Sequence, residues 1–334
     1  MTHVCITVDI EFSIGGAFAA PNRNLPIGES AVACVADGRE HGLGFILETL
    51  RSFGLTATFF VEALNYCYFG DRPMAAIAER IMKEGHDVQL HLHPCWLSFR
   101  DPQWKTRIAH DRPNDSCAGR SDAELDEMVL LGLDAFRRWG IPRPTALRTG
   151  NMQVDRAVYR AMARHNFRAS SNVARAIVRP PDSELQLLGG RYLVEGILEL
   201  PVLTYKDLAI GGWEHEHALT ITGCSSRETE FLLEGAYAAG LDPVVVLTHC
   251  FEFINRRHDR FTKVRPHRAN QRRLVKLCRF VAEHPHKFSA TPISRVALDR
   301  ETEPSHANIS LRVPLWTALG RMAEAQLNDR FYAR

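Results

Sequence analysis

The chain has 334 residues, of which 45% are apolar and 24% charged, and its formal net charge at pH 7 is +2. This balance is ordinary for a globular protein, and the length allows one large α/β domain or two smaller ones. The small net charge gives no electrostatic case for nucleic acid or an anionic membrane as a partner. The apolar runs are strand-sized, well short of the roughly 20 residues that cross a bilayer.

The cysteines and the first residues bear on the cellular compartment. The eight cysteines are scattered, and no two have the C-x-x-C spacing of a zinc knuckle or redox site. No basic segment followed by an apolar leader opens the sequence, and residues 4–8 already have the pattern of a buried strand. We therefore expect a cytoplasmic protein with reduced thiols.

Short apolar runs alternate with helical patterns along the chain. The expected elements, in chain order, are a strand at 4–8, a helix at 45–53, strands at 56–61 and 87–92 around a helix at 74–82, a helix at 125–139, a strand at 145–147, a helix at 154–165, strands at 198–202 and 243–247, and a helix at 270–283. Repeated strand–helix units predict a parallel sheet with helices outside. So many units favour a closed or nearly closed barrel over an open sheet.

We expect residues 1–300 to form a single (β/α) barrel domain and residues 301–334 to form a C-terminal extension that ends in a helix. The segments 94–121 and 204–227 are long for plain connections, and such loops are often functional. The first carries Trp96, Phe99 and Trp104. These aromatic side chains either stack on sugar rings beside a cleft or form a small satellite core, and the sequence leaves both readings open.

Two pairs of polar residues follow predicted strands. Asp9 and Glu11 are two residues apart, as are His91 and His93, so each pair points to one face. Two carboxylates in such a position can divide metal binding and proton transfer between them. Two imidazoles and one carboxylate make a three-ligand zinc site with an open position for water. The alternatives are a carboxylate that caps a turn and histidines that are satisfied in the core.

Two further segments place polar groups after strands. Arg148 can pair with a carboxylate and hold it ionised. Gly150 and Asn151 allow unusual backbone geometry that exposes N–H groups to an oxyanion. His249 ends an apolar run, which suits a general acid at a barrel mouth. Taken singly, these segments are equally compatible with an ordinary strand-to-helix turn and with a buried histidine bonded to backbone.

The four segments, taken together and in this order, resemble the polysaccharide deacetylase family (the NodB-homology domain, carbohydrate esterase family 4). The resemblance covers roughly residues 1–295 and includes the framework segments 57–61, 85–88 and 199–202. It implies a distorted (β/α) barrel, usually with seven strands. It also implies a bound divalent metal, for which zinc is expected.

The resemblance implies a role for each matching residue. Asp9 is similar to the family's catalytic base, and Arg148 to the arginine that braces it. Glu11, His91 and His93 look like the metal ligands. His249 is similar to the histidine that protonates the leaving amine, and Leu247 would line the pocket for the acyl methyl group.

Three departures place the chain in a divergent branch. An isoleucine separates Asp9 from Glu11 where the family has adjacent aspartates, and the two histidines lie two residues apart instead of four. The segment 148–151 reads Arg-Thr-Gly-Asn in place of Arg-x-Pro-Tyr. Asp207 and Trp213 are candidates for the aspartate and tryptophan of the family's fourth motif.

The expected function is metal-dependent removal of an N-acyl group, expected to be acetyl, from an amino sugar or glycan. One alternative is a C–N hydrolase of a small amide or ureide on the same barrel. Another is a non-catalytic carbohydrate- or nucleotide-binding protein. The basic segment 256–268 follows His249 and is either a solvated surface or a site for a phosphorylated or nucleotide-linked substrate. No nucleic-acid partner is expected, and the sequence leaves the oligomeric state open.

Overall fold

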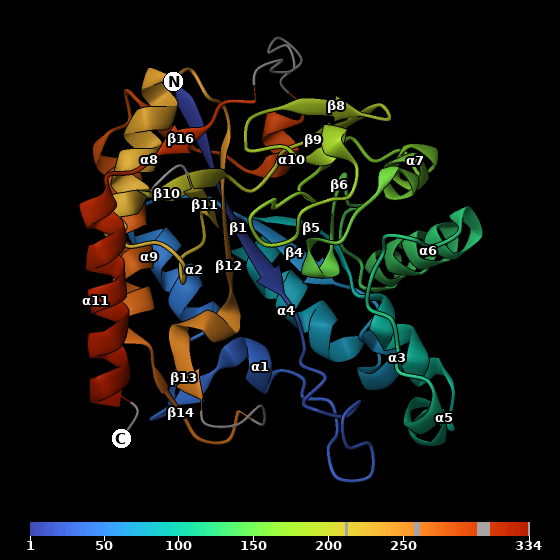
Figure 1. Cartoon of the computed structure of the whole chain (residues 1–334). Coiled ribbons are helices and arrows are strands. Elements are labelled where there is room, and N and C mark those ends of the chain that lie inside the picture. The colour runs from blue at the N-terminus through green and yellow to red at the C-terminus, as the bar shows by residue number, and fades with distance from the viewer. Residues whose placement is uncertain (211–212, 257–260, 299–307, 333–334) are drawn as a thin grey trace.

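A curled β-sheet forms the centre of the molecule, and helices cover its outside (Figure 1). The structure is a computed structural model that describes residues 1–210, 213–256, 261–298 and 308–332. Among these residues the main sheet has nine strands. Their order is β12 (Val244–His249), β1 (Thr2–Ile10), β4 (Thr58–Glu62), β5 (Asp87–Leu92), β6 (Ala146–Thr149), β7 (Ala169–Ser170), β9 (Ile197–Glu199) and β8 (Tyr192–Val194), with β15 (Phe288–Ala290) also beside β1.

Neighbouring strands from β12 through β9 run parallel, and β8 is antiparallel to β9. The chain that leaves β9 returns to the opposite side of the sheet, where Val202 forms a parallel bridge with Val245, and Thr220 forms one with Leu247. The sheet therefore curls towards a barrel, as expected, but it has nine described strands, and the expected count of seven is not confirmed. The curl gathers the carboxyl ends of the parallel strands at one edge, where barrel enzymes place their active sites.

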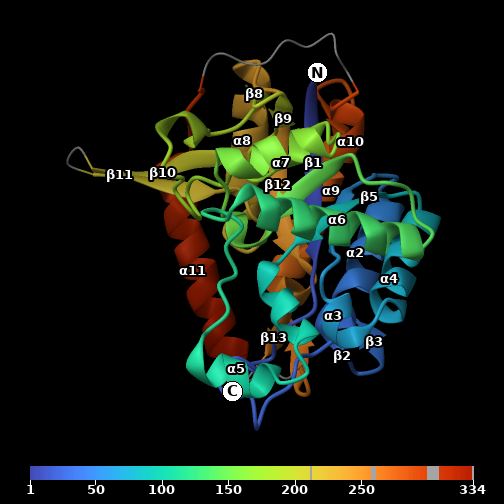
Figure 2. The same cartoon turned by 90° about the vertical axis from the view of Figure 1, so that its right-hand side faces the viewer.

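The longer helices pack against the outside of the sheet, and Figure 2 shows α6 and α7 lying across it. They are α2 (Leu43–Ser52), α4 (Arg72–Lys83), α6 (Asp122–Arg138), α7 (Arg156–Arg164), α8 (Ser226–Ala238), α9 (Arg268–Glu283) and α11 (Leu315–Tyr332). The shorter α-helices are α1 (Ser30–Ala33), α3 (Tyr66–Phe69), α5 (Trp104–His110) and α10 (Ile293–Val296). The 3-10 helices are η1 (Pro94–Arg100), η2 (Gly150–Met152), η3 (Ser183–Leu185) and η4 (Cys250–Phe253).

Alternate side chains of the central strand β1 enter two separate apolar layers. Val4, Ile6 and Val8 of β1 join the layer that contains the helices, whereas Cys5 joins a smaller layer on the concave face. In β12, Val245 and Leu247 belong to the concave layer. Asp9 and His249 continue these alternate positions, so the concave side of the sheet ends in polar groups.

Three small sheets lie around the main one. They are β2 (Val35–Ala36) with β3 (Arg39–Glu40), β13 (Ile254–Arg256) with β14 (Val264–Pro266), and β10 (Thr204–Ile210) with β11 (Trp213–Ala218) and β16 (Leu311–Arg312). Figure 2 shows the β10–β11 hairpin projecting from the body. Within the part of the chain that the structure describes, no helix has the length and apolar character needed to cross a membrane.

Two expectations about the connections need correction. The segment 204–227 is not a loop, because β10 and β11 pair as an antiparallel hairpin. β10 places Lys206 beside Asp207 and β11 alternates glutamate with histidine, so neither strand shows the apolar alternation typical of a half-buried strand. The C-terminal extension is not a free appendage, since β16 pairs with β10 and α11 packs beside it. The domain boundary near residue 300 falls in the segment 299–307, which is outside the described residues, and stays a prediction.

Candidate active site

The strand register brings the predicted polar residues together at the carboxyl edge of the sheet. Asp9 of β1 pairs with His249 of β12, and His91 of β5 pairs with Arg148 of β6. Glu11 directly follows β1, and His93 directly follows β5. Four segments that are far apart in the sequence therefore contribute to one site.

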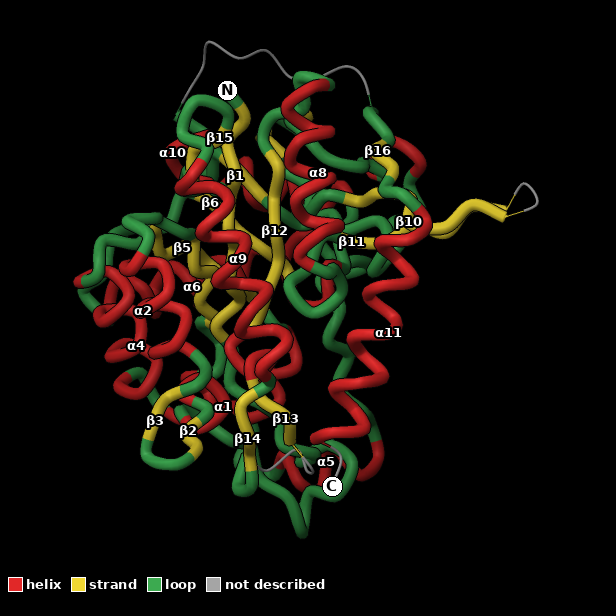
Figure 3. The backbone as a smooth tube through the Cα atoms, turned by 90° about the vertical axis from the view of Figure 1, so that its left-hand side faces the viewer, coloured by secondary structure: helices red, strands yellow, loops and turns green. Residues whose placement is uncertain are grey.

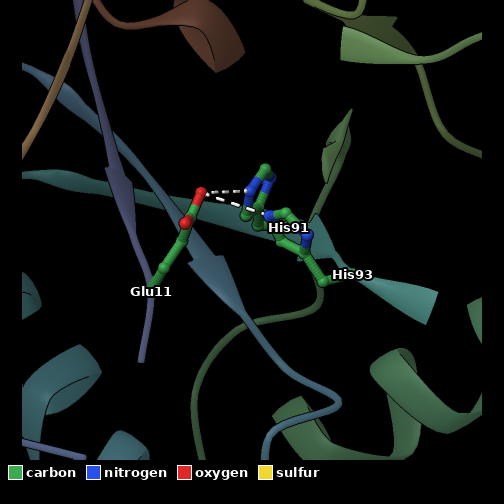
Figure 4. Close-up of side chains that lie close together, drawn as sticks. All are labelled: Glu11, His91 and His93. Atoms are coloured by element: carbon green, nitrogen blue, oxygen red, sulfur yellow. Dashed lines mark hydrogen bonds and ion pairs between the residues drawn. The ribbon is translucent and has the colours of Figure 1, made fainter. Parts of the chain in front are cut away.

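Glu11, His91 and His93 point towards one another (Figure 4). Glu11 Oε1 lies 3.0 Å from His91 Nε2 and 3.3 Å from His93 Nε2. The Nε2 atom of His93 is buried and has no partner in hydrogen-bond geometry among the described residues. One carboxylate and two imidazole nitrogens form a donor set that suits zinc, and an unsatisfied buried nitrogen aimed at the shared point fits a cation there.

The other ring nitrogen of each imidazole is held by a hydrogen bond. His91 Nδ1 is 2.9 Å from the carbonyl oxygen of Arg148, and His93 Nδ1 is 2.7 Å from Asp115 Oδ2. These acceptors require the proton on Nδ1, which leaves both Nε2 atoms free to coordinate a metal. Asp115 lies in the long segment 94–121 and was not predicted, because no motif or spacing connects it with His93.

Asp115 also ties the neighbouring loops to the site. Its Oδ1 accepts a hydrogen bond from the backbone N–H of Cys95 at 3.1 Å, and its Oδ2 accepts one from Asn151 Nδ2 at 2.9 Å. His93, Cys95 and Asp115 are another set of potential ligands, which shares His93 with the set of Glu11, His91 and His93. The direct bond from His93 Nδ1 to Asp115 favours an orienting role for this carboxylate.

The segment 150–151 differs in part from the expectation. The unusual backbone is at Asn151, whose φ is +55°, and Gly150 is not in the left-handed region. Gly150 is required for another reason: a Cβ atom there would lie 2.4 Å from His93 Nδ1. Glycine thus makes room for the imidazole ring, while the expected oxyanion contact stays a prediction.

Arg148 braces Asp9 from inside the sheet. Its guanidinium is fully buried, and its Nη1 donates to Asp9 Oδ1 at 2.7 Å. The remaining donors bind the carbonyl oxygen and hydroxyl of Ser171, and the guanidinium lies 4.2 Å from the centre of the Phe60 ring. This leaves Asp9 Oδ2 facing His91 Nε2 at 4.0 Å and His249 Nε2 at 3.7 Å. A charged hydrogen bond to one oxygen keeps the carboxylate oriented while the other oxygen faces the site.

His249 stands on the opposite side of the site from His93. Its Nδ1 lies 2.8 Å from Glu252 Oε1, and Thr248 Oγ1 donates to Glu252 Oε2 at 2.6 Å. Burial opposes protonation of His249, but the hydrogen bond and charge of Glu252 prevail and raise its pKa to about 9. At neutral pH the imidazole is therefore protonated and can donate from Nε2. Glu252 was not predicted, although it lies only three residues after His249.

The charges of the ligand group stabilise one another. Burial opposes ionisation of Glu11, yet the imidazoles of His93, His91 and His249 hold its pKa well below the usual range. Burial likewise opposes protonation of His93, but Glu11 and Asp115 raise its pKa well above the usual value. The Glu11 carboxylate is thus held ionised, and a cation bound there would replace the imidazole protons that now compensate its charge.

A pocket of about 190 Å³ opens beside Glu11, His93 and Asp115. Aromatic rings and one arginine contribute most of the rest of its lining: Phe12, Trp96, Phe251, Phe261 and Arg256. Trp96 is only 1% exposed and packs against Phe69 and Phe99, as in a satellite core, and it also lines the pocket, so its contact with a sugar stays a prediction. Leu247 is buried in the concave apolar layer and is not part of the pocket lining.

The other candidates lie elsewhere or cannot be placed. Asp207 binds His215 and Arg321 beneath α11, so it is not a site residue. The side chain of Trp213 lies outside the described part of the chain, as do Arg257, His258 and Arg260 of the basic segment. Arg256 reaches the pocket lining and stacks on Phe251 and Phe261.

Comparison with known proteins identifies the fold. No family model and no curated protein sequence matches the chain. Among solved structures, a Mycobacterium smegmatis protein described as a polysaccharide deacetylase aligns with a TM-score of 0.52 at 16% identity, over 93% of this chain and 95% of that one. The chain has the polysaccharide deacetylase fold. The resemblance inferred from the four segments is confirmed at this level.

Two further similar structures have lower TM-scores. A family 4 carbohydrate esterase from Streptomyces lividans aligns with a TM-score of 0.43 at 11% identity, over 93% of this chain and 98% of that one. A family 4 acetyl xylan esterase from Clostridium thermocellum aligns with a TM-score of 0.45, at the same identity and coverage. The 16% identity to the Mycobacterium smegmatis protein agrees with a divergent branch.

Proposed function

We propose that this protein is a metal-dependent hydrolase that removes an N-acyl group, acetyl in the first instance, from an amino sugar or glycan. The observation that carries the proposal is the arrangement of three functional units around one point. Glu11, His91 and His93 offer ligand atoms, the braced carboxylate of Asp9 lies to one side, and the protonated imidazole of His249 lies within 3.7 Å of Asp9. The fold shared with the Mycobacterium smegmatis protein supports this reading.

A divalent cation held by Glu11, His91 and His93 would supply polarisation of the acyl carbonyl and of a water molecule. The chain's own residues would move the protons. Asp9 Oδ2 would accept a proton from the attacking water, because Arg148 occupies the other oxygen and leaves Oδ2 facing the site. The water oxygen then forms its bond to the acyl carbon.

His249 would complete the reaction on the leaving side. Its Nε2–H donates a proton to the amine nitrogen as the C–N bond breaks, and Glu252 holds the ring in the required orientation through Nδ1. One proton is taken from water by Asp9 and one is given to the amine by His249. The products are a free amino sugar and a carboxylic acid.

The substrate class rests on the pocket and stays a proposal. Aromatic side chains border the pocket, and Arg256 gives it one cationic group. The amino-sugar or glycan substrate is part of the proposal, whereas a phosphorylated or nucleotide-linked form and the cytoplasmic location stay predictions without further support.

Acetate release from N-acetylglucosamine oligosaccharides tests the proposed function. We expect purified protein to lose activity after stringent chelation and to regain it with zinc or another divalent cation. Asp9→Asn should keep its metal and lose hydrolysis, while the exposed Asp37→Asn serves as the matched control with normal turnover. Full activity of the chelated protein would contradict metal dependence. Turnover of small amides or ureides without any turnover of N-acetyl sugars would favour the other C–N hydrolase.

A further inference from the structure

The C-terminal helix α11 has its apolar side turned away from the protein. The side chains that face the body include Thr317 and Ala318, which are 2% and 0% exposed. Large apolar side chains point outwards: Leu315 is 47% exposed, Trp316 57%, Leu319 56% and Met322 42%. A surface helix ordinarily shows the opposite pattern, with its apolar stripe against the core.

Polar contacts attach this helix to the body. The guanidinium of Arg321 binds Asp207, lies 3.2 Å from Glu228 and donates to the carbonyl oxygen of Gly223 at 3.1 Å. Glu324 accepts a hydrogen bond from Arg273 Nη2 at 2.7 Å. Largely buried charge pairs thus hold the helix, and among its described side chains the large apolar ones take no part in these pairs.

The outward apolar surface continues onto the adjacent helix α8. Phe231 is 41% exposed, and its ring centre lies 5.7 Å from that of Trp316 in an edge-on contact. Figures 1 and 3 show α11 along the outside of the molecule. We call these residues the α11–α8 face: Phe231, Leu315, Trp316, Leu319 and Met322.

We propose that the α11–α8 face is the surface on which a second copy of this chain docks, which makes the protein a homodimer. Leu315, Leu319 and Met322 follow the i, i+4, i+7 spacing that forms one continuous ridge. A two-fold interface places such a ridge against its own copy. A Cβ atom added at Gly320 would meet nothing within 4 Å, so a partner can approach the helix closely at this position.

The area of the α11–α8 face agrees with a second copy of the chain as its partner. Five large apolar side chains, each about half exposed, present roughly 400 Å², which is the scale at which an apolar patch on a monomer marks an interaction site. Two copies would cover roughly 800 Å² of apolar surface, and a polar rim would bring the total near the 1,200 Å² or so of a specific interface. On α8, Arg227 and Glu230 form an ion pair with each other at 2.9 Å, next to Phe231 in the sequence, and supply part of such a polar rim.

A membrane surface fits this face less well. Helices that lie on membranes carry lysine and arginine on the polar side. Here Arg321 is engaged with Asp207 and Glu228, and the chain as a whole has a net charge of only +2.

Light scattering coupled to size-exclusion chromatography of the full chain tests the proposal. We expect wild type to have twice the monomer mass of 37.7 kDa. Leu319→Glu should elute as a monomer with unchanged acetate release and melting temperature, because Leu319 is far from the catalytic residues in the fold. Leu130→Glu is the matched control, since Leu130 of α6 is 53% exposed and lies outside the face; it should remain dimeric.

Cysteine cross-linking provides a second test of the dimer in case Leu319→Glu fails to fold. Under mild oxidation Leu319→Cys should form a covalent dimer, and Leu130→Cys should not. A wild-type chain that is monomeric overturns the proposal, whether it stays alone or binds vesicles of phosphatidylcholine and phosphatidylglycerol. A Leu319→Glu variant that stays dimeric overturns it as well. The measurement is independent of deacetylation, so the proposed function and the dimer can fail separately.

Discussion

His93 and His249 occupy similar surroundings on opposite sides of the site, and they are nevertheless suited to different tasks. His93 is buried and His249 is half-buried, and each binds a carboxylate through Nδ1, Asp115 for the first and Glu252 for the second. His93 Nε2, however, lies 3.3 Å from Glu11, and His91 adds a third ligand atom there. His249 Nε2 lies 3.7 Å from both Asp9 and Glu11.

This difference in distances suits His93 to metal binding and His249 to proton donation. Besides His93, Cys95 and Asp115, two groups of residues that both contain Glu11 could hold a cation: Glu11, His91 and His93 form the first, and Asp9, Glu11 and His249 form the second. Metal binding by the second group would occupy the carboxylate of Asp9, which Arg148 holds, and the imidazole of His249, which Glu252 keeps protonated. The first group leaves both free for proton transfer, and the variants below test that choice.

The largest effect is expected for His91→Ala. Loss of one of three ligands should abolish stoichiometric metal binding and hydrolysis together. Metal analysis of the purified variant by inductively coupled plasma mass spectrometry checks this, with the exposed His110→Ala as control. A variant that keeps a full equivalent of metal would move the site to the second group.

His249→Gln should separate metal binding from catalysis. The variant removes the proton donor but no ligand of the first group, so metal content should be unchanged while kcat falls by about 10²–10⁴-fold. Metal content and kcat measured on the same preparation give the answer. If metal is lost as well, His249 is a ligand, and its assignment as the acid is wrong.

Asp115→Asn should act on the metal through His93. The amide is a weaker acceptor for the Nδ1 proton, so the affinity for zinc should fall by about 10–100-fold, with most of kcat recovered at saturating metal. Competition with a chromophoric chelator measures the affinity. Asp111→Asn, an exposed position in the same segment, should bind zinc normally; equal affinities of the two variants would leave Asp115 with a purely structural role.

The contrast between the two histidines also shows what the sequence can predict. Asp9, Glu11, His91, Arg148 and His249 could be predicted because each lies at or just beyond the end of a parallel strand, and the sheet brings such positions together. Strand periodicity and the order of the segments carry this information. They therefore anticipate both the curled sheet and the cluster at its edge.

The partners of these residues could not be predicted in the same way. Asp115 reaches His93 from a long segment whose path depends on how Trp96 and its aromatic neighbours pack. The β10–β11 hairpin and the reversed polarity of α11 depend on tertiary contacts, namely the pairing with β16 and the burial of Arg321. The hairpin lacks apolar alternation in the sequence, and the spacing of the apolar residues in α11 does not show which side of the helix faces the body.

The smallest effect in this series is expected for Glu252→Gln. The carboxylate binds His249 Nδ1 at 2.8 Å and is itself held by Thr248. An amide can still accept the hydrogen bond but lacks the charge, so the loss should be about that of one charge-assisted hydrogen bond, or roughly tenfold in kcat. Metal content should not change, because Glu252 belongs to neither group of potential ligands.

A double variant shows whether Glu252 acts through His249. If Glu252 serves only to orient and charge the imidazole, Glu252→Gln should have no further effect once His249 is already glutamine, and the two losses should not add. Equal tenfold losses in both backgrounds would mean that Glu252 acts independently of the imidazole. The comparison between the two sides of the site would then fail, because Glu252 would no longer correspond to Asp115.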